Sequence, residues 1–207
     1  MRKDQKIIVG IDEAGRGPLA GPMVIAAVAV VKSDRWRVIS AGIKDSKKLS
    51  PRKREFWYNK LCSSPSIVSA SASVAHGVID HIGISRAARL AVSRCLRKIS
   101  QHTALNTHQF HVLLDGGLFA PREYSQKTII RGDEKVALIS AASIVAKVTR
   151  DRLMVRCSKK YPEYCFEIHK GYGTRAHFAS IKKYGLSPVH RKSFCKFYVS
   201  KKQDARG

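Results

Sequence analysis

Two apolar segments near the start of the chain are separated by a loop rich in glycine and proline. Residues 7–11 are short and rich in β-branched side chains, and residues 23–31 form the longest apolar run, nine residues. Such segments are typical of buried strands, and the loop at 14–22 predicts a turn that makes them antiparallel neighbours. Nine residues are about half of what a membrane helix requires, so we expect no membrane span.

Further strands and helices follow along the chain. The pattern predicts strands at 66–74, 110–114 and 128–130, and helices that begin at Ser50-Pro51, near 84, at 136 and at 174. This order indicates an α/β or α+β layer fold with a small helical C-terminal appendage. No linker rich in Ser, Gly or Pro divides the chain, so we expect residues 1–155 and the appendage, 156–207, to pack on one core.

The chain carries 39 Lys and Arg residues against 15 Asp and Glu residues, a formal net charge of +24. This charge favours a polyanionic partner, with nucleic acid first, because each neutralised phosphate releases counterions. A merely basic protein and a membrane-surface binder are the alternatives. The five cysteines are widely spaced and form no Cys-x-x-Cys pair. With an N-terminus that does not resemble a signal peptide, they predict reduced thiols and a cytoplasmic location.

Acidic residues are few, and several stand where predicted strands end. Asp12 and Glu13 follow the first strand, Asp115 follows the fourth, and Asp133 stands just before the helix that begins at 136. If the first and fourth strands are neighbours, these carboxylates converge at one edge of the sheet and repel one another unless a cation lies among them. Oxygen ligands select Mg²⁺ or Mn²⁺ rather than zinc, and two such ions would support phosphodiester hydrolysis. Taken singly, each acid has an alternative role in a turn or helix cap.

Three further segments carry candidates for substrate binding, which are Gly15, Arg16, Gly17, Lys47 and Tyr172. The Gly-Arg-Gly loop lets the backbone approach an anion and adds a guanidinium. Lys47 stands near a helix start, where phosphate binding and a solvated face are equally good interpretations. Tyr172 lies between two glycines, where its ring could stack on a base or cover the edge of the core.

Seven blocks of the chain closely resemble bacterial ribonuclease HII. They are IDEAGRGPLAGP at 11–22, DSKKL at 45–49, LDG at 114–116, GD at 132–133, ISAASIVAKVTRD at 139–151, HKGYGT at 169–174 and GLSPVHRKSF at 185–194. Together they span nearly the whole chain.

This resemblance implies a ribonuclease H-like mixed five-stranded sheet flanked by helices, with 1–155 as the catalytic domain. It implies a metal-dependent endoribonuclease that hydrolyses the RNA strand of RNA/DNA hybrids. The enzyme would also cut 5′ to single ribonucleotides embedded in duplex DNA, leaving 5′-phosphate and 3′-hydroxyl ends. The implied metal-binding and catalytic residues are Asp12, Glu13, Asp115 and Asp133, with Mg²⁺ or Mn²⁺ as cofactor. The Gly-Arg-Gly loop would read the ribose 2′-hydroxyl and its flanking phosphates, and Tyr172 would stack on the substrate. We expect a monomer.

The chain departs from the family pattern at two positions, Gly117 and Gly83, where asparagine is usual. The related ribonuclease HIII carries an extra N-terminal domain and an acid four residues after the third carboxylate, where this chain has Phe119, so the pattern favours HII. Two other functions remain open: a non-catalytic nucleic-acid-binding protein, which the charge alone would support, and a junction resolvase. Cleavage of a duplex with one ribonucleotide, but not of its all-DNA twin, would separate the three.

Overall fold

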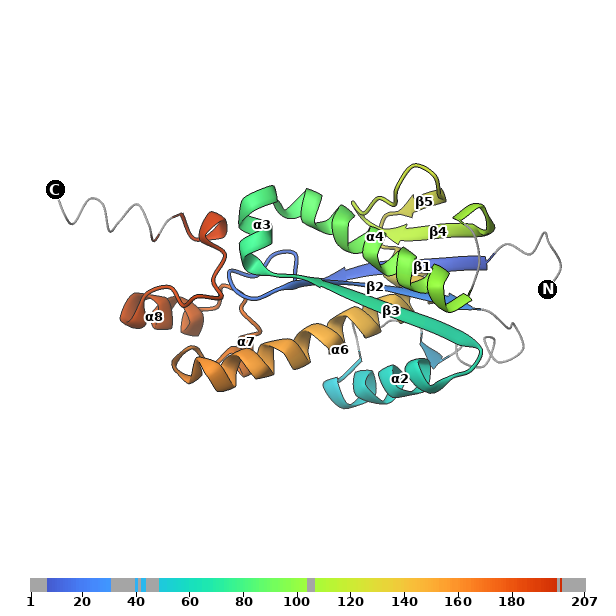
Figure 1. Ribbon diagram of the computed structural model, residues 1–207. Coiled ribbons are helices and arrows are strands. Elements are labelled where there is room, and N and C mark those ends of the chain that lie inside the picture. Colours follow the sequence, from blue (N-terminus) through green and yellow to red (C-terminus); the bar gives the residue numbers. More distant parts are fainter. Residues whose placement is uncertain are drawn as a thin grey trace.

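The centre of the fold is a mixed sheet with helices on both faces (Figure 1). The computed structural model describes residues 7–30, 40, 42–43, 49–103, 107–196 and 198. Within these residues, five strands form one sheet in the order β3-β2-β1-β4-β5. Their bounds are β1 Ile7–Ala14, β2 Met23–Val30, β3 Ile67–Val74, β4 Phe110–Asp115 and β5 Ser125–Ile129. The pairs β1/β2 and β2/β3 are antiparallel, while β1/β4 and β4/β5 are parallel, which confirms the predicted mixed sheet.

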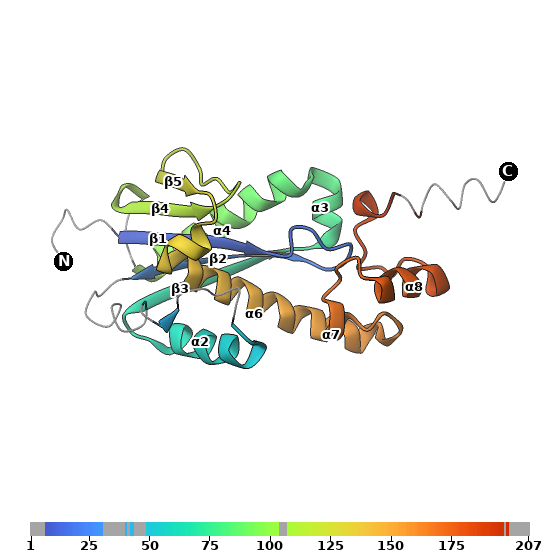
Figure 2. The same cartoon turned by 180° about the vertical axis from the view of Figure 1, so that it is seen from behind.

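The helices form a layer on each face of the sheet and a group at one end. Their bounds are α2 Pro51–Ser63, α3 His76–Ile82, α4 Ile84–Thr103, α5 Gly132–Lys135, α6 Ala137–Lys160, α7 Phe166–His169 and α8 Arg175–Tyr184. Helix α4 covers one face, and α6 with α2 covers the other (Figure 2). Helices α7 and α8 lie beyond the end toward which β1 points (Figures 1 and 2).

Strand β2 shows why both faces must be covered. Its alternate residues 23, 25, 27 and 29 belong to the core under α4, and residues 24, 26 and 28 belong to the core under α6. Because successive strand side chains point to opposite faces, a continuous apolar run requires a layer on each side. Gly10 allows α6 to pack closely against β1. A Cβ at this position would lie only 2.4 Å from the backbone carbonyl carbon of Leu138.

The predicted helix starts depend on local capping. The Ser50 side chain accepts a hydrogen bond from the N–H of Lys53 at 3.3 Å, and Pro51 occupies the first turn of α2. The Thr174 side chain caps α8 in the same way, accepting from the N–H of His177 at 3.3 Å. Both helices therefore begin where the sequence predicts.

Several boundaries differ from the prediction. Pairing with β2 continues to Ala14, so Asp12 and Glu13 lie inside β1 instead of after it. Strand β5 begins at Ser125 rather than 128, because it pairs with β4 from His111 onward. Asp133 lies in a separate helix, α5, since the extended backbone of Val136 (φ −124°) separates α5 from α6. Helix α6 continues to Lys160, so the proposed division between 155 and 156 would fall inside it. No helix in the described part of the chain is long and apolar enough to cross a membrane.

Candidate active site

The parallel pairing of β1 and β4 brings two carboxylates together. Ile11 is the register partner of Leu114, and Asp12 and Asp115 each follow that pair by one residue. The two side chains line one pocket of about 410 Å³, together with Glu13. The expectation that the first and fourth strands are neighbours is therefore confirmed.

Asp12 lies in an unfavourable electrostatic position. It is 5% exposed, and burial, together with the nearby charges of Asp115 and Glu13, raises its pKa to about 8. A hydrogen bond from the Ser143 side chain and one from the N–H of Glu13, at 2.7 Å to Oδ1, oppose this rise. Burial also raises the pKa of Glu13, while the nearby Arg16 lowers it. Burial is the main cause of both shifts, and the neighbouring carboxylates add to it.

The Asp115 side chain is held in place by Gly132, the residue before the fourth candidate acid, Asp133. Its Oδ1 accepts a hydrogen bond from the backbone N–H of Gly132 at 2.5 Å. Asp133 is the next residue and is 2% exposed, but it does not line the pocket. The structure thus brings Asp12, Glu13 and Asp115 together at the pocket, whereas Asp133 is buried outside the residues that line it.

The carboxylate oxygens at the pocket are suitable ligands for a hard divalent cation. All three pocket acids offer carboxylate oxygens, which are the ligands that Mg²⁺ and Mn²⁺ prefer. In the described part of the chain, no three His, Cys, Asp or Glu side chains are close enough together to hold a metal ion. Mg²⁺ is commonly held by one or two carboxylates, with water and substrate phosphates completing its shell. An incomplete protein cage is compatible with such an ion.

The Gly-Arg-Gly loop forms another wall of the same pocket. Arg16 is half-exposed, and its Nη1 lies 3.3 Å from Glu13 Oε1. Gly15 has a φ of +88°, and a Cβ there would lie 1.9 Å from Nε of Arg150. Glycine is required at this position because both the backbone conformation and the space exclude a side chain.

Tyr172 also lines the pocket and is 44% exposed. Its ring lies over the guanidinium of the buried Arg150, with 5.7 Å between Cζ and the ring centroid. The ring is thus presented at the pocket, as expected for a residue that stacks on a ligand. The other predicted substrate contact, Lys47, lies outside the described residues.

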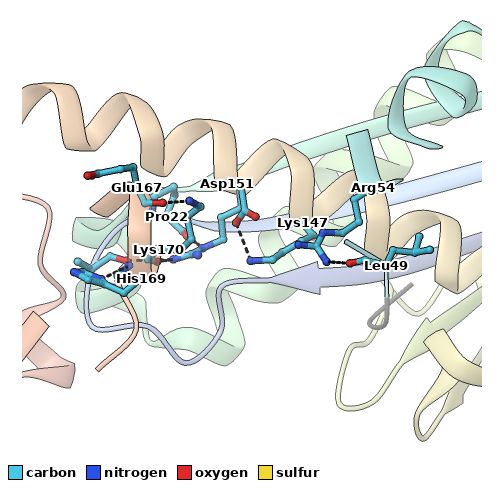
Figure 3. Close-up of polar contacts among 11 residues, drawn as sticks. Pro22, Leu49, Arg54, Lys147, Asp151, Glu167, His169 and Lys170 are labelled. Atoms are coloured by element: carbon cyan, nitrogen blue, oxygen red, sulfur yellow. Dashed lines mark hydrogen bonds and ion pairs between the residues drawn. The ribbon is translucent and has the colours of Figure 1, made fainter. Parts of the chain in front are cut away.

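Three polar pocket residues were not among the predicted site residues: Arg54, Ser143 and Lys147. Ser143 and Lys147 lie on α6. A serine within the apolar stripe of a helix is a sequence signal that could have identified Ser143. Lys147 forms an ion pair with Asp151 at 2.8 Å, and Arg54 donates to the carbonyl of Leu49 at 2.5 Å (Figure 3). Both cations thereby have defined positions at the pocket edge.

A second hollow of about 590 Å³ shares Arg54 and Lys147 with the first. Its other basic residues are Arg152, Arg156 and Lys170, and its acids are Glu55 and Asp151. Arg152 pairs with Glu55 at 2.5 Å. The basic lining therefore continues along α6 from Lys147 to Arg152 and Arg156, away from the pocket of Asp12 and Asp115.

Comparison with known proteins gives a consistent result. A family model described as Ribonuclease HII matches residues 9–197. The chain is 46% identical over 189 residues to a ribonuclease HII of Coxiella burnetii, covering 91% of this chain and 88% of the relative. It is 43% identical over 200 residues to one of Caldicellulosiruptor bescii, covering 97% and 92%.

Solved structures show the same likeness. The ribonuclease HII in a complex with PCNA from Archaeoglobus fulgidus has a TM-score of 0.70 and 25% identity, over 89% of this chain and 93% of that one. The ribonuclease H2 of Pyrococcus horikoshii has a TM-score of 0.66 and 29% identity, over 90% and 93%. These structures confirm the α/β mixed-sheet fold.

Proposed function

We propose, because this chain belongs to the ribonuclease HII family, that it removes single ribonucleotides from duplex DNA as well as RNA from hybrids. The protein is an endoribonuclease of the type 2 ribonuclease H class, and its family acts on RNA/DNA hybrids. The finer proposal is that it cuts 5′ to an embedded ribonucleotide and leaves 5′-phosphate and 3′-hydroxyl ends.

One observation carries this proposal. The carboxylates of Asp12 and Asp115 share a pocket with the Gly-Arg-Gly loop and with the exposed ring of Tyr172. Hydrolytic and recognition groups therefore surround the same space. The loop would bind the ribose 2′-hydroxyl and its flanking phosphates, and the 2′-hydroxyl is what distinguishes RNA from DNA at one nucleotide.

The chain's own residues have separate tasks in this proposal. Asp12, Glu13 and Asp115, which line the pocket, would hold Mg²⁺ or Mn²⁺, in two sites during the reaction, and Ser143 orients Asp12 through its hydrogen bond. Asp133 lies outside the lining, and we propose that it joins them when a cation is bound. The bound cations would activate water and stabilise the leaving oxygen of an in-line displacement. The Gly132 N–H holds the Asp115 carboxylate in place. Tyr172 would stack on a nucleotide, and Lys147 and Lys47 would bind phosphates.

Electrostatics favour the same substrate. The net charge of +24 and the basic hollow beside the pocket both suit a nucleic-acid duplex. We propose that the enzyme works as a monomer in the cytoplasm.

The decisive experiment compares two labelled duplexes that differ by one 2′-hydroxyl. With Mg²⁺ or Mn²⁺, the duplex that contains one ribonucleotide should be cut 5′ to it, and the all-DNA twin should stay intact. Mass spectrometry of the products should show 5′-phosphate and 3′-hydroxyl ends. Cleavage of both duplexes would indicate a resolvase-type nuclease, and binding without cleavage would indicate a non-catalytic binding protein.

A further inference from the structure

A buried arginine, Arg191, holds the Gly-Arg-Gly loop from the side opposite the pocket. Its guanidinium donates to three carbonyl oxygens: Nη2 to Gly15 at 2.7 Å, Nη1 to Arg16 at 2.9 Å and Nε to Gly21 at 3.0 Å. Its backbone N–H donates to the carbonyl of Leu19 at 2.7 Å. Arg191 is fully buried and does not line the pocket, whereas residues 15–17 do. The loop therefore separates Arg191 from the pocket.

This arrangement decides which way the loop's peptide groups point. In a trans peptide the N–H is directed opposite to the C=O, and the described chain has no cis peptide. Since the carbonyls of Gly15 and Arg16 point at Arg191, the N–H groups of Arg16 and Gly17 point away from it, toward the pocket side. Successive N–H groups on one side of a loop form a concavity that binds anions.

The charge behind the loop suits the same ligand. Arg150 lies against Gly15 and is also fully buried, with its guanidinium bound to the carbonyls of Ala20, Pro22 and Lys170. Among the described residues, no ion pair joins either arginine to a carboxylate. Two buried cations that bind carbonyl oxygens and have no ion-paired carboxylate are costly in the free protein. An anion bound on the other side of the loop would offset their charge.

We propose that Arg191 is a positioning residue for substrate binding, which directs the N–H groups of Arg16 and Gly17 at a phosphate oxygen of the nucleic-acid backbone. The proposal rests on the proposed function, because it concerns the same pocket. It assigns Arg191 no part in the chemical step, so its loss affects the binding of substrate more than its turnover.

The test is the steady-state kinetics of Arg191→Gln and Arg191→Lys on the duplex with one ribonucleotide, well below the melting temperature of each variant. Arg191→Gln should raise KM roughly ten- to hundredfold, as expected for the loss of a hydrogen bond to a charged group, and change kcat by less than about threefold. Arg191→Lys keeps the charge and can still donate to a carbonyl, so its KM should lie between the KM of the wild type and that of Arg191→Gln. Should the Gln variant not fold, the increase in KM of the Lys variant carries the test.

The matched control is Ile99→Ala, a fully buried site on α4 that touches neither the loop nor the pocket. This variant should lose thermal stability and keep the wild-type KM. A wild-type KM in folded Arg191→Gln, or an equal rise in Ile99→Ala, would overturn the proposal. Failure of the wild-type enzyme to cut the duplex is a different result, which would overturn the proposed function itself.

Discussion

The Nε2 atoms of His177 and His190 lie 3.0 Å apart in the interior, joined by a hydrogen bond. The N–H of Ser187 donates to Nδ1 of His190 at 2.9 Å, so the proton of His190 is on Nε2 and is donated to His177. Nδ1 of His177 then donates to the carbonyl of Tyr172 at 2.9 Å. The chain of hydrogen bonds requires two neutral rings and ends on the residue that presents its ring to the pocket.

The contribution of this pair to stability is predicted to fall in mild acid, opposite in sign to that of Asp12 and Glu13, whose pKa values are raised. Burial lowers the pKa of both histidines to about 4, whereas an unfolded histidine titrates near about 6.5. Between these values the unfolded state binds more protons, so the free energy of unfolding falls as pH falls, by at most about 1.4 kcal/mol per pH unit for each proton. Denaturant titrations at several pH values from 7.5 to 4.5 measure this free energy of unfolding. The double variant His177→Gln, His190→Gln should show a weaker pH dependence, and an identical slope would contradict the prediction.

Asp115→Asn should lower cleavage more than about a hundredfold, because it removes one of the carboxylate charges at the pocket. The fold should persist, since the amide oxygen of asparagine can still accept the hydrogen bond from Gly132. Initial rates on a hybrid substrate, together with circular dichroism, measure both effects. Near-wild-type activity in this variant would remove Asp115 from the metal site.

Metal ions should stabilise the wild-type protein measurably. Mg²⁺ binds the folded state, so the melting temperature should rise with its concentration, and a chelator should reverse the rise and abolish cleavage. Above a pH of about 8 the Asp12 carboxylate is ionised, and Asp12→Asn, measured there, removes a buried charge that Asp115 and Glu13 repel. The metal-free variant should therefore melt higher than the metal-free wild type and gain less from Mg²⁺. Equal gains in the two proteins would show that Asp12 does not bind the ion.

Tyr172→Ala should lower cleavage at a single ribonucleotide roughly ten- to hundredfold, because stacking on a base is worth about 1–3 kcal/mol. Tyr172→Phe should retain most of the activity, since it keeps the ring. Thermal stability should change little, because the side chain is partly exposed. A large drop in melting temperature with normal specific activity would instead assign the ring to the core.

Gly10→Ala should destabilise the protein by about 1–3 kcal/mol or more, because the new methyl group would meet the backbone of α6 at Leu138 and Ile139. Gly77→Ala is its control: the site lies in α3, and a Cβ there meets nothing within 4 Å. Alanine at 77 should stabilise the helix by up to about 1 kcal/mol. Urea unfolding compares the two, and equal stabilities would show that α6 does not pack tightly on β1.

The sequence by itself determined the local elements and the donor chemistry. Apolar runs predicted β2 and β3 nearly to the residue and the start of β1, and the caps at Ser50 and Thr174 predicted where α2 and α8 begin. These signals are local, since strand periodicity and capping depend on residues only a few positions apart. The acids at the strand ends predicted the pocket that Asp12, Glu13 and Asp115 share, provided that the first and fourth strands were neighbours.

Only the tertiary structure decided whether the first and fourth strands are neighbours and which groups surround the acids. Parallel pairing of β1 with β4 sets Asp12 beside Asp115, and the packing of α6 brings Ser143 to Asp12. Arg191 binds carbonyls at Gly15 and Arg16, far earlier in the chain. Its partners could not be read from local spacing, because a guanidinium buried among carbonyls leaves no periodic pattern. Partners of this kind are set by how distant elements pack against one another, and only the fold brings those elements together.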